Sequence, residues 1–316
     1  PRKRYLMVEC LICNEKFPED KGLHMHLRSH SMRMVEYYQK FFPRKDLHNG
    51  EMIKFKNKEY YFSRDFNTKT NLKSWLRNQT ETKRKNYCEE ILKKRIEEGK
   101  SFIAPSQVEL RSIMSPPVQY YESLFGSYEK LCRSLGFQNR FYSYPNEGML
   151  ERMIKVNSTE IAIDTREQKP IKFSRPTIVK KLDYGDYTLH DEELAVGCFI
   201  ERKSINDLIG TMSGGLERFK KEIERAIENE SYIVVLVERP ITECMAFDKL
   251  PYVSKKIKAT PDFIFKNIRD LLQSYYDIQF LLKGRSESER LIEKLLFSGG
   301  AFKDYDLQLS YDLGFL

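Results

Sequence analysis

The chain has 316 residues, of which 41% are hydrophobic, and its 54 lysines and arginines outnumber its 46 aspartates and glutamates, for a net charge of +8. No apolar run approaches the ~20 residues of a membrane-spanning helix, and the basic start, Pro1 to Arg4, lacks the apolar region of a secretory signal. Six cysteines in a chain of this length do not make a disulfide framework, and four of them are scattered along it. We expect two or three domains, and the positive charge favours a polyanionic partner.

The first 33 residues carry a pattern typical of a structural zinc site. Its spacing is C-x2-C-x12-H-x3-H, with Phe17 and Leu23 at the places where a ββα finger needs its small core. Two thiolates on a knuckle and two imidazoles one helical turn apart can surround Zn²⁺ tetrahedrally. We therefore predict a C2H2 zinc finger over residues 1–33. The four ligands would be Cys10, Cys13, His26 and His30.

The finger is a poor candidate for reading bases. The helix positions that commonly do so would be Glu19, Gly22 and Met25, none of which suits the major groove. We expect a structural role or phosphate contacts, and base reading remains the alternative. The residues available for phosphates are Lys16, Lys21, Arg28 and Arg33.

Residues 34–80 are predicted to be a connector with helices at 34–42 and 70–76. Between the two helices, the apolar and aromatic stretches 52–55 and 59–62 flank Lys-Asn-Lys. This arrangement predicts a short β-hairpin.

Residues 81–140 form a second module. A basic helix over 81–98 is followed by short helices that open near Pro105, Pro117 and Phe125. Short helices joined by tight turns suit a DNA reader of the helix-turn-helix kind, and a plain helical linker domain is the alternative. Residues 141–157 are then predicted to be a linker, since they contain Ser, Pro, Asn and Gly.

Three strand-like segments of the second half carry charged residues. Asp164 ends an apolar run, Asp186 follows a glycine at the start of a second strand, and Glu201-Arg202-Lys203 ends a third. On a strand Glu201 and Lys203 share one face and Arg202 points to the other. A carboxylate can hold a hard divalent cation, and a neighbouring ammonium can orient water or stabilise charge on a phosphate. The alternative is a solvated charge run.

The rest of this half alternates between helices and strands. Thr260-Pro261 marks a helix start, and Ser286 with Glu289 predicts a capping box. The resulting order, β-β-β-α-β-α-β-α, predicts a mixed sheet covered by helices. The predicted elements are helix 215–228, strand 232–238, helix 260–275, strand 278–282 and a helix ending at 296.

The segments 163–167, 185–187 and 200–207 read IDTRE, GDY and IERKSIND. They resemble the nuclease domain of the XPF family, which belongs to the PD-(D/E)xK restriction-endonuclease-like superfamily. The resemblance covers roughly residues 158–300 and implies Mg²⁺- or Mn²⁺-dependent cleavage of DNA. It implies Asp186 and Glu201 as metal ligands, Asp164 as a further ligand or a supporting acid, and Lys203 as the catalytic lysine. Supporting residues would be Arg166, Glu167, Arg202 and Asp207, although Asp207 could instead cap the next helix.

The helical module resembles the small repeat found beside the catalytic domains of homing endonucleases. The resemblance rests on PSQVEL at 105–110, FGSY at 125–128 and LGF at 135–137. It implies binding of target DNA. The predicted DNA contacts, with the basic helix included, are Lys83, Arg84, Lys85, Gln107, Arg111, Gln119, Tyr120 and Lys130.

The fold class expected is therefore a multidomain α+β protein: a ββα finger, a helical DNA-binding module and, over 158–316, an α/β restriction-endonuclease-like domain. XPF-type nucleases usually carry tandem helix-hairpin-helix motifs after the nuclease domain, and residues 298–316 are too few for them. We therefore expect the N-terminal modules to select DNA.

The function expected is a metal-dependent DNA endonuclease of the site-directed homing type. The alternatives are a nuclease specific for flaps or junctions, and a DNA-binding regulator with an inactive nuclease fold. The expected partners are DNA and no membrane, with a homodimer through the nuclease domain or a monomer equally open. The expected location is the cytoplasm of a bacterium or phage-infected cell, or the nucleus of a eukaryote.

Overall fold

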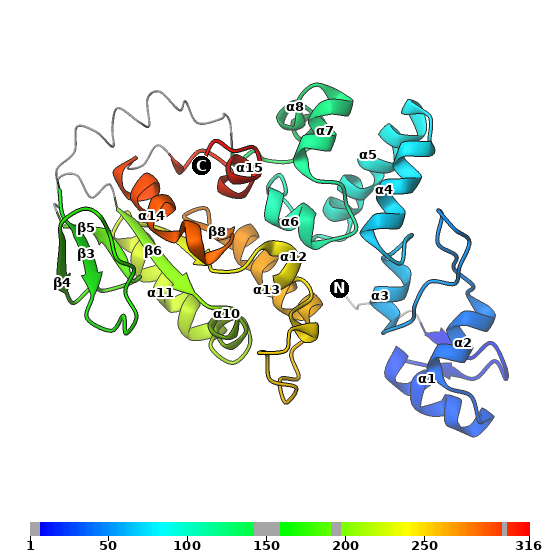
Figure 1. The fold of residues 1–316 in the computed structure, drawn as a ribbon. Helices are drawn as coiled ribbons and strands as arrows, with labels where there is room; N and C mark the ends of the chain where they lie inside the picture. Colours follow the sequence, from blue (N-terminus) through cyan, green and yellow to red (C-terminus); the bar gives the residue numbers. More distant parts are fainter. Residues whose placement is uncertain (1–6, 142–158, 191–196, 299–301) are drawn as a thin grey trace. The chain divides into compact units, whose positions relative to one another are not determined.

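The structure is a computed structural model that describes residues 7–141, 159–190, 197–298 and 302–316 (Figure 1). It divides into two compact units, Pro1–Arg84 and Lys85–Leu316. In the described ranges, no helix is both long and apolar enough to cross a membrane. The predicted linker, 141–157, lies outside the described residues except for Phe141.

The first unit begins with the predicted ββα finger. Strand β1 (Val8–Glu9) pairs antiparallel with β2 (Lys16–Phe17), and helix α1 (Asp20–His26) continues into the 3-10 helix η1 (Leu27–His30). Leu23 is buried as expected, and so is Leu27.

The connector completes the core of the finger. Its helices are α2 (Met34–Phe41), α3 (Lys58–Phe62) and α4 (Lys69–Asn78). The buried rings of Tyr37 and Tyr38 pack with Leu23 and Leu27, and the Tyr37 hydroxyl accepts a hydrogen bond from the Leu11 amide at 2.9 Å. A finger of this size has little apolar surface of its own, so this packing adds to what a metal supplies.

The predicted hairpin at 52–62 is wrong. Asn57 lies at the N-cap of α3, where its side chain accepts a hydrogen bond from the Tyr60 amide at 2.7 Å. The second half of the expected hairpin is therefore helical, while Met52 makes an isolated antiparallel bridge with Lys45. Asparagine favours both turns and N-caps, so the sequence pattern was ambiguous here.

The helical module has the expected helices. They pack around a core that includes Cys88, Leu110, Tyr121 and Cys132, together with Leu309 from the far end of the chain. The unit boundary falls within the first of them. The helices are α5 (Glu81–Glu97), α6 (Gln107–Ser112), α7 (Val118–Phe125) and α8 (Tyr128–Ser134).

The second unit contains a six-stranded mixed sheet in the order β4-β3-β5-β6-β7-β8. Strand β5 runs antiparallel to β3 and β6, and the remaining neighbours are parallel. The mixed sheet was predicted, but the edge strand β4 was not. The strands are β3 (Ile161–Asp164), β4 (Thr177–Lys180), β5 (Tyr187–Leu189), β6 (Cys198–Lys203), β7 (Tyr232–Val237) and β8 (Ile278–Leu282).

Helices cover both faces of this sheet (Figure 1). Alternate residues of β7 enter the two cores: Val235 packs on one face and Val234 on the other. A continuously apolar strand requires this double burial. One face carries α10 (Ile205–Met212), α11 (Leu216–Glu228), α12 (Ile241–Cys244) and α13 (Pro261–Ser274), and the other carries α14 (Ser288–Phe297) and α15 (Leu307–Asp312).

The capping box predicted before α14 is absent. A 3-10 turn, η3 (Arg285–Glu287), precedes α14. Glu287 is the N-cap residue of α14, and its side chain makes no cap hydrogen bond. The carboxylate of Glu289 instead accepts a hydrogen bond from the Ser174 amide at 3.0 Å. A tertiary contact has therefore taken the side chain that the local pattern assigned to the helix end.

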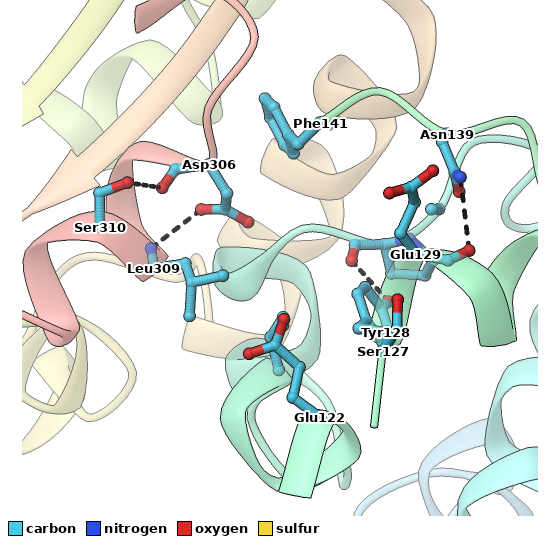
Figure 2. A pocket seen from close by; sticks show the side chains of 12 residues that line it. Glu122, Ser127, Tyr128, Glu129, Asn139, Phe141, Asp306, Leu309 and Ser310 are labelled. Atoms are coloured by element: carbon cyan, nitrogen blue, oxygen red, sulfur yellow. Dashed lines mark hydrogen bonds between the residues drawn. The ribbon is translucent and has the colours of Figure 1, made fainter. Parts of the chain in front are cut away.

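Buried polar contacts join residues 101–141 to the sheet and its helices. Asp306 accepts hydrogen bonds from the amides of Gln107 at 2.6 Å and Leu309 at 3.0 Å, so one carboxylate lies at the N-termini of both α6 and α15. Figure 2 shows Asp306 beside Leu309 in the wall of a cavity of about 160 Å³. Gln273 of α13 accepts from the amide of Ile103 at 3.1 Å, and Arg140 donates to the carbonyl of Leu272 at 3.3 Å.

We expect Asp306→Ala to lower the free energy of unfolding by about 2–4 kcal/mol, because it removes an N-cap and leaves the Gln107 amide without its acceptor. Burial raises the pKa of Asp306 to about 6, so urea unfolding is measured at pH 7.5, where the carboxylate is ionised. Asp248→Ala, at an exposed position of η2 (Phe247–Lys249), is the control. Equal stabilities of the two variants would contradict the proposed contact.

Candidate active site

Sheet pairing brings the predicted acids together. Asp164 ends β3, Asp186 directly precedes β5, and Glu201 lies in the second half of β6. The Asp164 amide donates to the Asp186 carbonyl at 2.9 Å, and the Asp186 amide donates to the Ile200 carbonyl at 2.7 Å. Because β5 is antiparallel to both neighbours, its start lies at the carboxyl ends of β3 and β6. This is the edge at which α/β sheets commonly carry their sites.

The turn before β5 requires a glycine. Gly185 has φ of +68°, and a Cβ at this position would lie 3.2 Å from the carbonyl oxygen of Ile200 and 3.1 Å from Cβ of Phe199. A side chain would therefore be strained and would press on β6. The absence of a side chain at Gly185 therefore lets this turn lie close against β6.

Glu201 and Lys203 lie on the same face of β6, as predicted. The Lys203 ammonium is 2.6 Å from a Glu201 carboxylate oxygen, and their side chains are only 9% and 16% exposed. The ammonium also lies 5.3 Å from the ring centre of Phe219 on α11. A lysine held so closely presents its charge at one defined place.

The carboxylates of Asp186 and Glu201 are close enough for the charge of one to disfavour ionisation of the other. Asp186 accepts a hydrogen bond from the Arg202 amide at 2.7 Å. Burial, and then the negative charge of Glu201, raise the pKa of Asp186 to about 7. Burial also raises the pKa of Glu201, against the effect of Lys203. A divalent cation between the two groups would compensate this charge, and hard carboxylate oxygens fit Mg²⁺ or Mn²⁺.

Asp164 has a different environment. One oxygen accepts from the amide and guanidinium of Arg166 at 2.8 and 2.6 Å, and the other accepts from the Leu182 amide at 2.6 Å. Burial opposes its ionisation, but these hydrogen bonds keep the pKa of Asp164 below its usual value. With both oxygens occupied, Asp164 suits the supporting role better than the ligand role.

Arg202 points away from the site into a buried ion-pair network. Its guanidinium lies 2.9 Å from Glu167 and 2.9 Å from Glu238, and all three side chains are at most 10% exposed. Behind Glu238, Ser288 donates to it at 3.4 Å, and Lys283 donates to Ser288. Removing one member of such a network leaves an unpaired buried charge. The network therefore supports the position of β6.

Asp207 serves as a cap in this structure. The Ser204 hydroxyl donates to its carboxylate at 2.6 Å, and the Asp207 amide donates back to that hydroxyl at 3.2 Å. These bonds make a capping box at the start of α10. The alternative stated from the sequence is thus the one that the contacts favour.

Two acids near the site were missed by the sequence reasoning. Glu222 of α11 accepts a hydrogen bond from the Gly185 amide at 3.3 Å, and its charge contributes to the raised pKa of Glu201. Glu238 follows the apolar strand β7, which is the signal that identified Asp164. Glu222 lies one helical turn after Phe219, so helical spacing could have placed it near Lys203.

The structure removes Gln107 from the predicted DNA contacts. Gln107 is 0% exposed, and its side-chain amide donates hydrogen bonds to the side chains of Gln119 at 2.9 Å and Asp312 at 2.6 Å. Arg111 is paired with the same Asp312 at 2.6 Å. The other predicted contacts remain predictions: Lys83 and Lys130 are exposed, and Arg84, Lys85, Gln119 and Tyr120 are half-buried.

The predicted zinc ligands lie together in the first unit. The ligand atoms of Cys10, Cys13, His26 and His30 are all within 4.8 Å of one another. The Glu15 carboxylate is 3.4 Å from Nδ1 of His26, as expected of a group that orients a metal-binding histidine. This Cys2His2 set is compatible with tetrahedral Zn²⁺.

The sequence matches a family model at this site. Residues 163–260 match the ERCC4 domain. The matched segment contains Asp164, Asp186, Glu201 and Lys203, so the predicted resemblance to XPF-type nuclease domains is confirmed there. The match does not extend over residues 1–162. A search of curated proteins gave no match.

Two solved structures are similar to the chain. XPF from Aeropyrum pernix in complex with DNA is 19% identical with a TM-score of 0.33, covering 44% of this chain and 63% of that one. XPF from Aeropyrum pernix is also 19% identical with a TM-score of 0.33, covering 45% and 61%. The alignments therefore span about three fifths of those chains.

We expect Gly185→Ala to lower the free energy of unfolding by about 1–3 kcal/mol, since the new methyl group is strained and meets the Ile200 carbonyl. Gly210→Ala is a matched control, because Gly210 lies in α10 with nothing within 4 Å of an added Cβ. Alanine there should be neutral or slightly stabilising. Thermal unfolding of both variants measures the difference, and equal effects would contradict the geometry.

We expect the purified chain to bind one zinc ion, and His30→Ala to release it with loss of structure in the first unit. Elemental analysis gives the zinc content, and amide hydrogen exchange reports on the helices around Tyr37. His48→Asn, at an exposed position, should retain the metal. Full zinc content in His30→Ala would show that this ligand set is wrong.

Proposed function

We propose that the protein is a metal-dependent DNA endonuclease. The single observation that carries this proposal is the cluster at the carboxyl edge of β6: the half-buried acids Asp186 and Glu201, which interact electrostatically, with Lys203 2.6 Å from Glu201. The match to the ERCC4 domain supports nuclease chemistry for this cluster. The excess of basic residues supports a nucleic acid as the substrate.

In the proposed reaction Asp186 and Glu201 would hold Mg²⁺ or Mn²⁺, which would supply Lewis-acid activation of water and phosphate. Lys203 donates hydrogen bonds to the scissile phosphate and stabilises the negative charge that develops there. Asp164 keeps the turn after β3 in place. Arg202 keeps β6 in register through its two buried carboxylate partners.

The finer choice of substrate rests on the N-terminal modules. A zinc finger and a helical module before the nuclease domain favour a site-directed enzyme of the homing type, in which these modules select the target. A homodimer through the nuclease domain, and a location with cellular or phage DNA, belong to the same proposal. Cleavage of flaps or junctions is the second candidate, and the exposed aromatic surface described below favours it. A regulator with an inactive fold is disfavoured by the intact acids and Lys203.

We expect Glu201→Gln and Lys203→Met each to lower the cleavage rate at least about a hundredfold, because the first weakens the proposed metal site and the second removes a positive charge at the scissile phosphate. Full-length protein is incubated with Mg²⁺ or EDTA and either long linear duplex or a flapped junction. Glu217→Gln, on α11 with its side chain 81% exposed, is the control and should cleave normally.

The products separate the candidates. Discrete metal-dependent fragments of the duplex would support the site-directed enzyme, and cleavage confined to the junction would support the structure-specific one. Tight binding of both DNAs with no cleavage would contradict the proposed nuclease function and favour the regulator.

A further inference from the structure

The segment from the last residue of η2 to the first turn of α13, residues 249–263, is rich in lysine. It contains Lys249, Lys255, Lys256 and Lys258, all exposed, while Asp262 is its one acidic residue. We call this segment the 249–263 loop; it is gold in Figure 1. Such a concentration of positive charge attracts a polyanion.

The loop is held to the protein rather than suspended in solvent. Val253 is buried and the half-buried Ile257 packs against the same core as α12 and α13. The Val253 amide donates to the Leu250 carbonyl at 3.2 Å, and the Ile257 amide donates to Ser254 at 3.0 Å. Because these residues face inward, the lysines between them are directed outward at fixed places along the loop.

Two large aromatic rings are exposed on the same segment. Tyr252 is 45% exposed and Phe263 is 46% exposed. The guanidinium of Arg239 lies 4.8 Å from the ring centre of Tyr252, so the ring is held in place. Exposed aromatic rings beside lysines are the combination by which proteins bind unpaired nucleotides: the rings stack on bases, and the lysines pair with phosphates.

The loop follows β7 through α12 and η2, and β7 is parallel to β6, so the chain leaves the sheet toward the loop at the edge that carries Glu201 and Lys203. Arg239 directly follows Glu238, whose carboxylate lies 2.9 Å from Arg202, the residue between Glu201 and Lys203. At its other end, Asn267 of α13 donates to the Met212 carbonyl at the end of α10, the helix that follows Lys203. A DNA strand at the catalytic acids could therefore continue onto the loop.

We propose that the 249–263 loop is a DNA-binding surface of the nuclease unit, on which Lys255, Lys256 and Lys258 contact phosphates and Tyr252 and Phe263 stack on an unpaired base. The inference rests on the proposed function, since it takes DNA to be the substrate. It places part of DNA binding beside the cleavage site, in addition to the N-terminal modules.

The test measures DNA binding by full-length protein in EDTA, so that it does not depend on cleavage. Fluorescence anisotropy with a single-stranded oligonucleotide is recorded over a range of salt concentrations. The variants are Lys255→Gln with Lys256→Gln, and Tyr252→Ala with Phe263→Ala. The control, Lys172→Gln with Lys221→Gln, removes the same charge from exposed positions elsewhere.

We expect the lysine variant to bind more weakly and to reduce the slope of log affinity against log salt by about 1.4, for two lost phosphate contacts. The aromatic variant should lose about five- to a hundredfold in affinity for single strands with little change of slope. Losses equal to those of the control would overturn the proposal.

A second measurement identifies the contact directly. An oligonucleotide carrying 5-iodouracil is photocrosslinked to the full-length protein, and the attachment site is found by mass spectrometry. Crosslinks to Tyr252 or Phe263 support the proposal, and crosslinks found only outside the loop overturn it. Loop-dependent binding without Mg²⁺-dependent cleavage would keep this inference and reject the nuclease function, whereas normal cleavage with loop-independent binding would do the reverse.

Discussion

The site depends on the hydrogen bonds that hold the start of β5 between β3 and β6. The Asp186 amide donates to Ile200 and the Asp186 carbonyl accepts from Asp164, so three segments that are distant in sequence are tied at one point. Gly185 makes this approach possible through its positive φ. The result is a pair of carboxylates in a poorly solvated place, where their mutual repulsion favours uptake of a cation.

The alternation of side chains along β6 separates reaction from support. Glu201 and Lys203 lie on the face of the candidate site, whereas Arg202 lies on the other face, in the buried network with Glu167 and Glu238. One face of β6 thus carries the residues of the proposed reaction, and the ion pairs on the other face hold the strand in position. Glu238 of this network directly precedes Arg239, whose guanidinium lies against the ring of Tyr252 in the basic, aromatic loop proposed to bind DNA.

The helical module and the sheet form one compact unit because buried polar groups satisfy each other between them. Asp306 accepts from both α6 and α15, and Gln107 uses its amide for Gln119 and Asp312. Gln107 and Arg111, which the sequence predicts as DNA contacts, instead contact Asp312 within the protein. Among the exposed basic groups of this unit are lysines of α5, α8 and the 249–263 loop.

From the sequence alone one could predict the Cys2His2 set, the strands and helices around the acids other than β4, and the grouping of Asp186, Glu201 and Lys203. These follow from local spacing, from the alternation of a strand and from a motif that matches the ERCC4 domain. Contacts between distant segments decided the loss of the Glu289 cap, the burial of Gln107 and the approach of Glu222. Each of these outcomes depends on a contact between segments far apart in the chain, which no local pattern encodes.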